Sequence, residues 1–197
     1  MTTDLEKNDL ERVESLLDSM SLEEKAGQLS QYFYLQVPGQ DKFLEAELRA
    51  GRVGSFLFVT DPTKINSLQR IAVEETRLGI PLLFGFDVIH GFRTIFPVPL
   101  GMAASWDPKL YEQVQATAAR EARAVGIHWA FAPMLDIARD PRWGRIVEGA
   151  GEDPYLGARM AEAQVRGFQG ETLGSAGHII AGPKHYVGYG AALGGRD

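Results

Sequence analysis

The chain has 197 residues, of which 45% are hydrophobic and 23% charged, a composition typical of a globular domain large enough to bury a core. A formal net charge of −6 argues against nucleic acid and anionic membranes as partners, because both require clustered Lys and Arg. We expect no transmembrane segment and no signal peptide in this sequence, since it has no long apolar run and no basic-then-apolar leader; the absence of cysteine excludes disulfides and leaves the compartment open.

The first 28 residues are predicted to form a helical lead-in. Apolar residues recur at helical spacing across residues 4–20, which predicts a first helix. Ser21 is followed three residues later by Glu24, a pattern that fits a capping box. A second, short helix is therefore expected to begin at this serine.

Strands and helices alternate along the rest of the chain. Runs of aromatic and branched residues predict strands, whereas capping residues, prolines and glycines mark where helices begin and end. The predicted order is a strand over 29–37, a helix over 41–50, a strand over 54–59, a helix from Asp61-Pro62 to Gly79, a strand over 82–88, a loop over 90–105, a helix from Trp106-Asp107-Pro108 to about residue 125, a strand over 127–133, a helix over 154–169 and a strand over 178–186.

This alternation, with near-continuous apolar strands, is typical of a parallel sheet covered on both faces. An open doubly wound sheet predicts a glycine-rich phosphate loop, and neither a G-x-G-x-x-G nor a Walker sequence occurs. A barrel predicts polar residues at the end of strand after strand, as found at Asp87, in the loop after residue 133 and at Lys184-His185. The predicted fold class is α/β, the N-terminal part (about five β/α units) of a (β/α)8 TIM-type barrel.

A complete barrel needs eight strands and typically about 250 residues. Five strands would leave two sheet edges and an apolar inner face uncovered, which is an aggregation hazard. We therefore expect residues 1–197 to be the N-terminal portion of a barrel domain in a longer polypeptide, with the remaining strands outside this chain. The alternative is a complete small α/β domain.

The stretch 136–154 crowds three arginines, a tryptophan and several acids between a predicted strand and a predicted helix. One interpretation is a salt-bridged loop in which Glu148, Glu152 and Asp153 hold the arginines. A guanidinium also offers a fixed fork of donors suited to carboxylates or vicinal hydroxyls. One arginine can therefore face a ligand while the others hold the loop.

Lys184 and His185 are adjacent at the end of an apolar strand. Neighbouring side chains in a strand point to opposite sides unless the strand has ended or kinked, and Pro183 with the glycines around it favours such an irregularity. A buried lysine requires a partner, and Asp87 is the candidate. Position alone also allows Asp87 to be a turn former, and His90 is expected to be structural.

No metal and no cofactor is expected. The four histidines lack metal-ligand spacing, and the arginines and lysines lack the nest of glycines that a phosphate site needs. Asp, Arg, Lys and His beside aromatic residues best suit a neutral polyhydroxylated ligand. Sugars present such a surface, with hydroxyls at the edge and an apolar face.

Four segments carry a resemblance to a known family. They are residues 20–29, the run GFDVIHGFRTIFPVPLGMAASWD at 85–107, the run FAPMLDIARDPRWGRIVEGAGEDP at 131–154 and the run GPKHYVGYGAALGGRD at 182–197. In this order they resemble the N-terminal (β/α)8 domain of glycoside hydrolase family 3, especially its β-glucosidases, over essentially the whole chain.

The resemblance implies a retaining, exo-acting enzyme that releases β-linked glucose from the non-reducing end of β-glucosides or oligosaccharides. It implies that Asp87, Arg145, Lys184 and His185 hydrogen-bond the glucosyl hydroxyls in the −1 subsite, and that Arg93 borders the same pocket. The family's nucleophilic aspartate comes from a later barrel strand, and its acid/base usually comes from a following α/β-sandwich domain. No catalytic residue is therefore expected in this chain.

Several alternatives remain open. The β-N-acetylhexosaminidases of the family carry a histidine further along the segment that reads KHYVGYG here, so they are disfavoured. A β-xylosidase remains an alternative, although Asp87 suits the 6-hydroxyl of glucose. Two further alternatives are a non-catalytic sugar-binding fragment and an aldolase with Lys184 as Schiff-base nucleophile. The expected partners are the glycoside and the remainder of the same polypeptide; homo-oligomerisation and a cytoplasmic, periplasmic or secreted location stay open.

Overall fold

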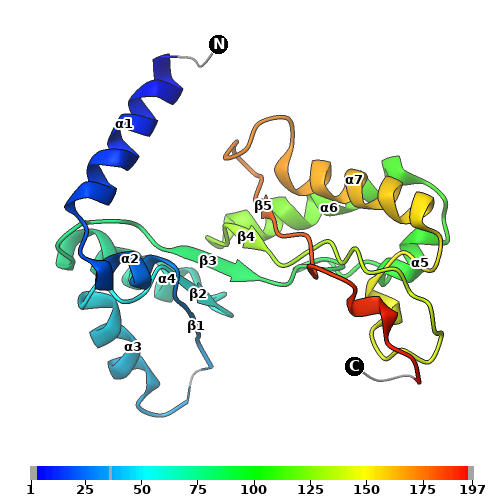
Figure 1. The fold of residues 1–197 in the computed structure, drawn as a ribbon, viewed down its shortest axis with the longest axis horizontal. Helices are drawn as coiled ribbons and strands as arrows, with labels where there is room; N and C mark the ends of the chain where they lie inside the picture. Colours follow the sequence, from blue (N-terminus) through cyan, green and yellow to red (C-terminus); the bar gives the residue numbers. More distant parts are fainter. Residues whose placement is uncertain (1–3, 36, 195–197) are drawn as a thin grey trace. The chain divides into compact units, whose positions relative to one another are not determined.

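A computed structural model describes residues 4–35 and 37–194, and the chain divides into two compact units, Met1–Phe84 and Gly85–Asp197 (Figure 1). The first unit contains α1 (Asp4–Ser19), α2 (Leu22–Gln28), β1 (Gln31–Phe33), α3 (Gln40–Arg49), β2 (Ser55–Leu57), α4 (Pro62–Arg70) and the π-helical turn η1 (Ile71–Glu75). The unit boundary falls within β3 (Leu83–Phe86), and the second unit continues with α5 (Pro99–Ala103), α6 (Pro108–Ala124), β4 (Trp129–Ala130), the 3-10 turn η2 (Ile146–Glu148), α7 (Pro154–Gln169), β5 (Ile180–Ala181) and the 3-10 turn η3 (Tyr189–Ala191).

The first unit is built on two parallel strands. Residues of β1 pair in register with β2, from Gln31 opposite Ser55 to Phe33 opposite Leu57. Its core gathers aromatic and aliphatic side chains of the strands and of α3 and α4. The capping box at α2 is present, because the Ser21 hydroxyl accepts from the Glu24 backbone N–H and the Glu24 carboxylate accepts from that of Ser21.

The second unit contains three parallel strand segments in the order β3, β4, β5. Helices α6 and α7 pack side by side, as Figure 1 shows. A Cβ added at Gly167 of α7 would lie 2.5 Å from the Glu112 carbonyl oxygen of α6, so only glycine permits this approach of the two backbones. The small side chains of Ala118, Ala119 and Ala122 on α6 form the core with residues of the strands.

Helices follow the sequence prediction closely, and strands are shorter than predicted. Helix α7 has the predicted bounds because Asp153 caps it, Pro154 opens it and Gly170 follows it. The predicted strand over 29–37 has only three residues in the ladder, Gln31–Phe33. Residues 1–3, 36 and 195–197 of the predicted ranges lie outside the described residues.

Two local predictions were wrong. The segment 90–105 is not all loop, because Pro99 opens the short helix α5, for which no capping side chain signals the start. The helix predicted to reach Gly79 ends at Glu75, where Thr76 turns to an extended conformation and its hydroxyl accepts from the Gly79 N–H. Within the described part of the chain, no helix has the length and apolarity needed to cross a bilayer.

Candidate functional site

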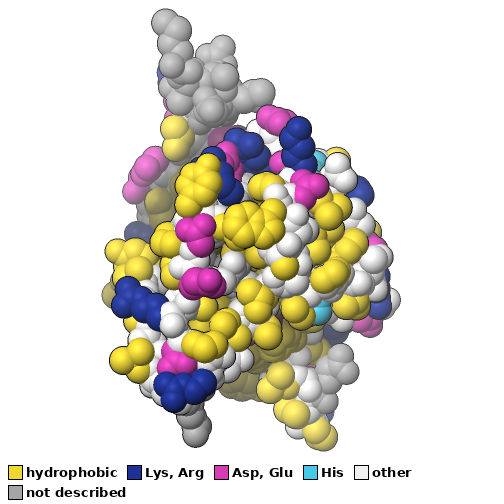
Figure 2. All heavy atoms as spheres, turned by 90° about the vertical axis from the view of Figure 1, so that its right-hand side faces the viewer, with side chains coloured by type: hydrophobic (Ala, Val, Ile, Leu, Met, Phe, Trp, Pro, Cys, Tyr) yellow, Lys and Arg dark blue, Asp and Glu magenta, His cyan; other side chains and the backbone are white. Residues whose placement is uncertain are grey.

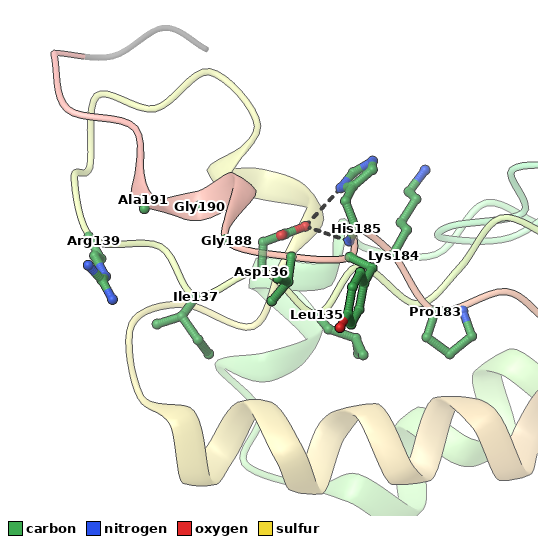
Figure 3. A pocket seen from close by; sticks show the side chains of 12 residues that line it. Leu135, Asp136, Ile137, Arg139, Pro183, Lys184, His185, Gly188, Gly190 and Ala191 are labelled. Atoms are coloured by element: carbon green, nitrogen blue, oxygen red, sulfur yellow. Dashed lines mark hydrogen bonds and ion pairs between the residues drawn. The ribbon is translucent and has the colours of Figure 1, made fainter.

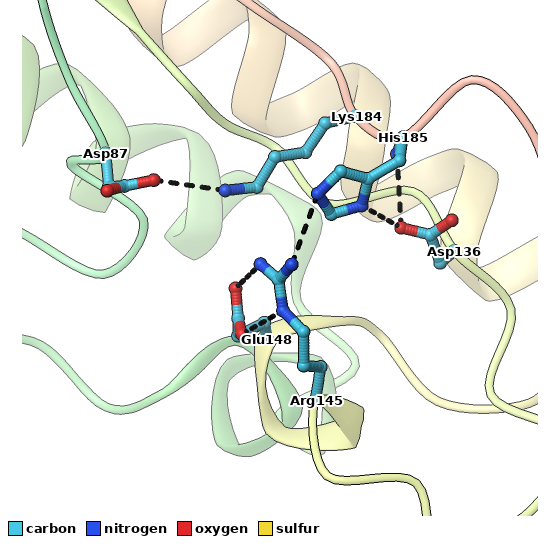
Figure 4. Close-up of polar contacts among 6 residues, drawn as sticks. All are labelled: Asp87, Asp136, Arg145, Glu148, Lys184 and His185. Carbon is cyan, nitrogen blue, oxygen red and sulfur yellow. Dashed lines mark hydrogen bonds and ion pairs between the residues drawn. The ribbon is translucent and has the colours of Figure 1, made fainter. Parts of the chain in front are cut away.

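The candidate site lies in the second unit, beyond the ends of β3, β4 and β5. Figure 4 shows six side chains that converge there: Asp87, Asp136, Arg145, Glu148, Lys184 and His185. Asp87 directly follows β3, the pair Lys184 and His185 comes shortly after β5, and the others belong to the loop between β4 and α7. Parallel strands bring these segments together because their carboxyl ends meet at one edge.

Lys184 and Asp87 form the ion pair expected from the sequence. The lysine Nζ lies 3.1 Å from the aspartate Oδ1, across 97 residues of sequence. The lysine side chain is 17% exposed and the aspartate side chain 46% exposed. The lysine is thus largely withdrawn from water and paired, while the carboxylate remains accessible to a ligand.

Arg145 and Glu148 form a two-pronged pair across η2. The arginine Nε and Nη2 each donate to one carboxylate oxygen, both at 2.6 Å. These bonds hold the pKa of Glu148 below its ordinary value, and they raise the pKa of Arg145. Both groups are therefore charged at neutral pH, and Glu148 does not serve as a proton donor there. The remaining nitrogen, Nη1, lies 3.3 Å from His185 Nε2.

His185 is held by Asp136 and by an aromatic neighbour. Asp136 Oδ2 lies 2.9 Å from His185 Nδ1 and accepts the His185 backbone N–H at 3.1 Å. The Asp136 side chain is only 2% exposed. The Tyr189 ring meets the imidazole edge-on at 4.7 Å between centroids, and it packs in turn on the buried Trp143 at 5.5 Å.

Two hollows open beside these residues. One, of about 420 Å³, lies between the segments 135–139 and 183–191 and is lined by Asp136, Lys184 and His185 together with apolar side chains (Figure 3). The other, of about 410 Å³, is lined by Arg145 and by residues 185–189, which include His185 and Tyr189. His185 borders both, so a ligand in either hollow can reach it. Both Lys184 and His185 lie beyond the end of β5 at Ala181, which removes the constraint that adjacent strand residues point apart.

Arg93 has its contacts within residues 4–35 and 37–194 at Phe92 and Glu121, away from this cluster. Its guanidinium lies over the Phe92 ring, 5.2 Å from the centroid, and its side chain is exposed. Its backbone N–H and that of Thr94 both donate to the Glu121 carboxylate of α6 at 2.8 Å. The role expected for Arg93 stays a prediction. His90 Nδ1 lies 3.1 Å from the Phe96 carbonyl oxygen, a contact that fits the structural role expected for this histidine.

The loop between β4 and α7 is held differently from the interpretation based on sequence. Glu148 does hold an arginine, but Asp153 caps α7 by accepting from the backbone N–H of Tyr155 and Leu156. Asp140 holds Arg142 instead, through a two-pronged pair with a shortest distance of 2.6 Å. Asp153 was mistaken for an ion-pair partner because an aspartate suits both a helix N-cap and an ion pair with arginine.

Asp136 was not singled out from the sequence as the partner of His185. Met134, Asp136 and Ala138 are buried while Leu135 and Arg139 are exposed, an alternation that the sequence does not show, because the exposed Leu135 is apolar and the buried Asp136 is charged. An acid on the buried side of such a segment needs a donor. The donor is 49 residues away, so spacing alone does not identify it.

The cluster combines strong donors with acceptors, as a hydroxyl-rich ligand requires. Lys184 and Arg145 donate, whereas Asp87 accepts and the imidazole does either according to its tautomer. Tyr189 adds an aromatic surface beside them. Among the residues that the structure describes, no group of three or more His, Asp or Glu has the geometry to hold a metal ion.

Comparison with known proteins assigns the family. The model of the glycosyl hydrolase family 3 N terminal domain matches residues 21–197. The chain belongs to this family. The resemblance seen in the sequence is confirmed.

Named relatives of the family 3 chain include a periplasmic β-glucosidase of Salmonella typhimurium, 38% identical over 188 residues, which cover 94% of this chain and 24% of the relative. A putative β-xylosidase of Formosa agariphila is 37% identical over 209 residues, 95% of this chain and 27% of the relative. The crystal structure of the Listeria innocua β-glucosidase in complex with glucose superimposes with a TM-score of 0.84 at 37% identity, over 94% of this chain and 28% of that one.

These likenesses confirm the predicted fold class, the N-terminal β/α units of a (β/α)8-type barrel. The family 3 chain spans about a quarter of the length of these relatives.

Proposed function

We propose that the polypeptide carrying this chain is a retaining, exo-acting glycosidase that releases β-linked glucose from the non-reducing end of β-glucosides or oligosaccharides. The observation that carries the proposal is the convergence of Asp87, Lys184, Arg145 and His185 in a family 3 chain. The β-glucosidase of Listeria innocua, with the same fold over 94% of this chain, has been crystallised with glucose.

In this proposal the segment supplies the −1 subsite. Lys184 and Arg145 donate hydrogen bonds to sugar hydroxyls, Asp87 accepts from them, and His185 contacts the same ring. The exposure of the Asp87 carboxylate and the two hollows beside His185 support these roles. Arg93 would border the pocket from the loop after β3.

The two carboxyl groups of the double displacement would come from elsewhere in the polypeptide. Glu148 is ionised, so it does not suit the acid/base, and both of its oxygens are bound by Arg145, so it does not suit the nucleophile. Asp136 is buried against His185 and suits neither role. A span of about a quarter of the relatives' length supports further polypeptide that completes the barrel and adds the α/β-sandwich domain.

A β-xylosidase is the second candidate, because the Formosa agariphila relative is named a putative β-xylosidase. The two substrates differ by a CH₂OH group, and residues outside this chain contribute to that choice. We expect Asp87 to favour glucose through its accessible carboxylate.

The test is kcat/KM of the full-length polypeptide on p-nitrophenyl β-glucoside and β-xyloside. We expect the glucoside to be preferred and Asp87→Asn to reduce that preference. Preference for the xyloside would favour the second candidate. Glucose binding by calorimetry with no turnover of either substrate would indicate a sugar-binding protein, and borohydride trapping of a carbonyl sugar on Lys184 would indicate an aldolase.

A further inference from the structure

The contacts from Glu148 through Arg145 and His185 to Asp136 determine where the imidazole proton lies (Figure 4). A guanidinium can only donate hydrogen bonds, so His185 Nε2, 3.3 Å from Arg145 Nη1, must act as the acceptor. The neutral ring then carries its single hydrogen on Nδ1. That hydrogen points at Asp136 Oδ2, 2.9 Å away. An ionised carboxylate has no hydrogen to donate and can only accept.

Asp136 is anchored so that it can impose this arrangement. Its side chain is almost completely buried, and one oxygen, Oδ2, accepts from both the backbone N–H and the ring of His185. The segment after β5 is packed closely on it, since a Cβ added at Gly190 would lie 3.3 Å from the Asp136 Cβ. The carboxylate therefore fixes both the position and the tautomer of the imidazole.

Glu148 completes the arrangement from the other side. It occupies Nε and Nη2 of Arg145, which leaves Nη1 directed at His185 Nε2. A ligand hydroxyl that enters between these two nitrogens can accept from Nη1 and donate to Nε2. With the opposite tautomer the hydroxyl would face two donors, and its own hydrogen would have no acceptor.

We propose that Asp136 is a positioning residue that holds His185 as a hydrogen-bond acceptor, so that Arg145 and His185 together select a ligand hydroxyl that both accepts and donates. The nature of the ligand, a sugar, rests on the proposed function. The tautomer does not, because it follows from the protein's own contacts.

The first test reads the tautomer in the ligand-free, full-length polypeptide. The ¹⁵N spectrum of protein labelled on histidine, with His185→Gln to assign the signal, is expected to show hydrogen on Nδ1 and a bare Nε2. Asp136→Leu should move the hydrogen to Nε2. A wild-type His185 that is protonated on Nε2, alone or on both nitrogens, would overturn the proposal whatever the substrate is.

The second test is a double-mutant cycle on kcat/KM for the β-glucoside. Asp136→Asn is expected to reduce kcat/KM about tenfold or more in the wild-type background, and to cause no further loss in a His185→Ala background. The matched control is Asp140→Asn, because Asp140 is also a buried acid of the same loop and binds Arg142 rather than His185. Its effect should be the same in both backgrounds.

Equal losses from Asp136→Asn in the two backgrounds would show that Asp136 acts on the fold and not through His185, and would overturn the positioning role.

A 3-, 4- or 6-deoxyfluoro glucoside supplies a third test, because fluorine cannot donate a hydrogen bond. At the position that His185 contacts, the fluoro substrate should be impaired in the wild type and not further impaired by His185→Ala. Inactivity of the wild type with the Nδ1–H tautomer intact would contradict the proposed function alone.

Discussion

Each ionisable side chain of the site is matched by a partner. Lys184 is paired with Asp87, Arg145 with Glu148, and His185 with Asp136. Removing one member costs stability in proportion to how deeply the remaining partner is buried, and the Asp87 side chain is 46% exposed whereas that of Asp136 is 2% exposed. Substitutions at single residues should therefore change binding and stability in distinguishable ways.

Lys184→Met should reduce kcat/KM of the full-length polypeptide by about tenfold to a hundredfold, because the proposed charge-assisted hydrogen bond from this lysine to the sugar would be lost. The methionine keeps most of the side-chain volume, so the thermal midpoint should change little. Lys109→Met is the control, because Lys109 is an exposed lysine at the start of α6. Unchanged kinetics for Lys184→Met would contradict the binding role of this lysine.

Glu148→Gln should make the protein less sensitive to acid. The pKa of Glu148 is lowered from an ordinary value of 4.5 by Arg145. A carboxyl group with a lowered pKa in the folded state contributes stability above its unfolded pKa, and this contribution is lost as the pH falls through the folded pKa. The wild type should thus exceed Glu148→Gln in thermal midpoint at pH 7, and the gap should close below pH 4.5. A gap as wide at pH 3 as at pH 7 would contradict the pairing.

The residues of the site were only partly predictable from the sequence. Asp87 and Lys184 were matched because each ends a strand and a buried lysine needs an acid. The pair Asp136 and His185 was missed because it depends on how the loops after β4 and β5 approach each other, which residue type does not reveal. Arg93 was expected at the site from family resemblance, and its described contacts lie with Phe92 and Glu121.

At the scale of elements, the loop after β4 and the segment after β5 are held together by backbone contact. Leu135 N–H donates to the Lys184 carbonyl oxygen, and Met134 and Lys184 form an isolated parallel bridge. Caps predicted the helices well, because a helix start depends on a few adjacent residues. The extent of the strands was not predicted, because a ladder depends on partners far along the chain.

Gly190→Ala should disrupt the site by separating these two segments. The added Cβ would lie 2.3 Å from the Ile137 carbonyl oxygen, which is backbone and cannot turn aside. We expect a lower thermal midpoint and a loss of kcat/KM larger than tenfold, since His185 would leave Asp136. The control is Gly144→Ala, where an added Cβ meets nothing within 4 Å. Equal behaviour of the two variants would contradict the close packing.

At the scale of the molecule, the candidate site lies wholly in the second unit, and each unit has its own hydrophobic cluster. Figure 2 shows a face on which hydrophobic side chains gather with few charges among them. On the segment after β5, Tyr186 is fully exposed, and Val187 and Leu193 are more than 80% exposed. Exposed apolar side chains at the end of a parallel strand are typical of a surface that another segment covers.

The isolated 197-residue chain should therefore bind a hydrophobic dye such as anilinonaphthalene sulfonate and self-associate in sedimentation, whereas the full-length polypeptide should bind little dye. Replacing both Tyr186 and Val187 with serine should reduce dye binding by the isolated chain without changing its circular dichroism, because neither side chain is buried in the unit. Tyr155→Ser is the control, since Tyr155 on α7 is also largely exposed but packs beneath Arg159. If the isolated chain were monomeric and bound no dye, these side chains would not be the surface on which further strands complete the barrel.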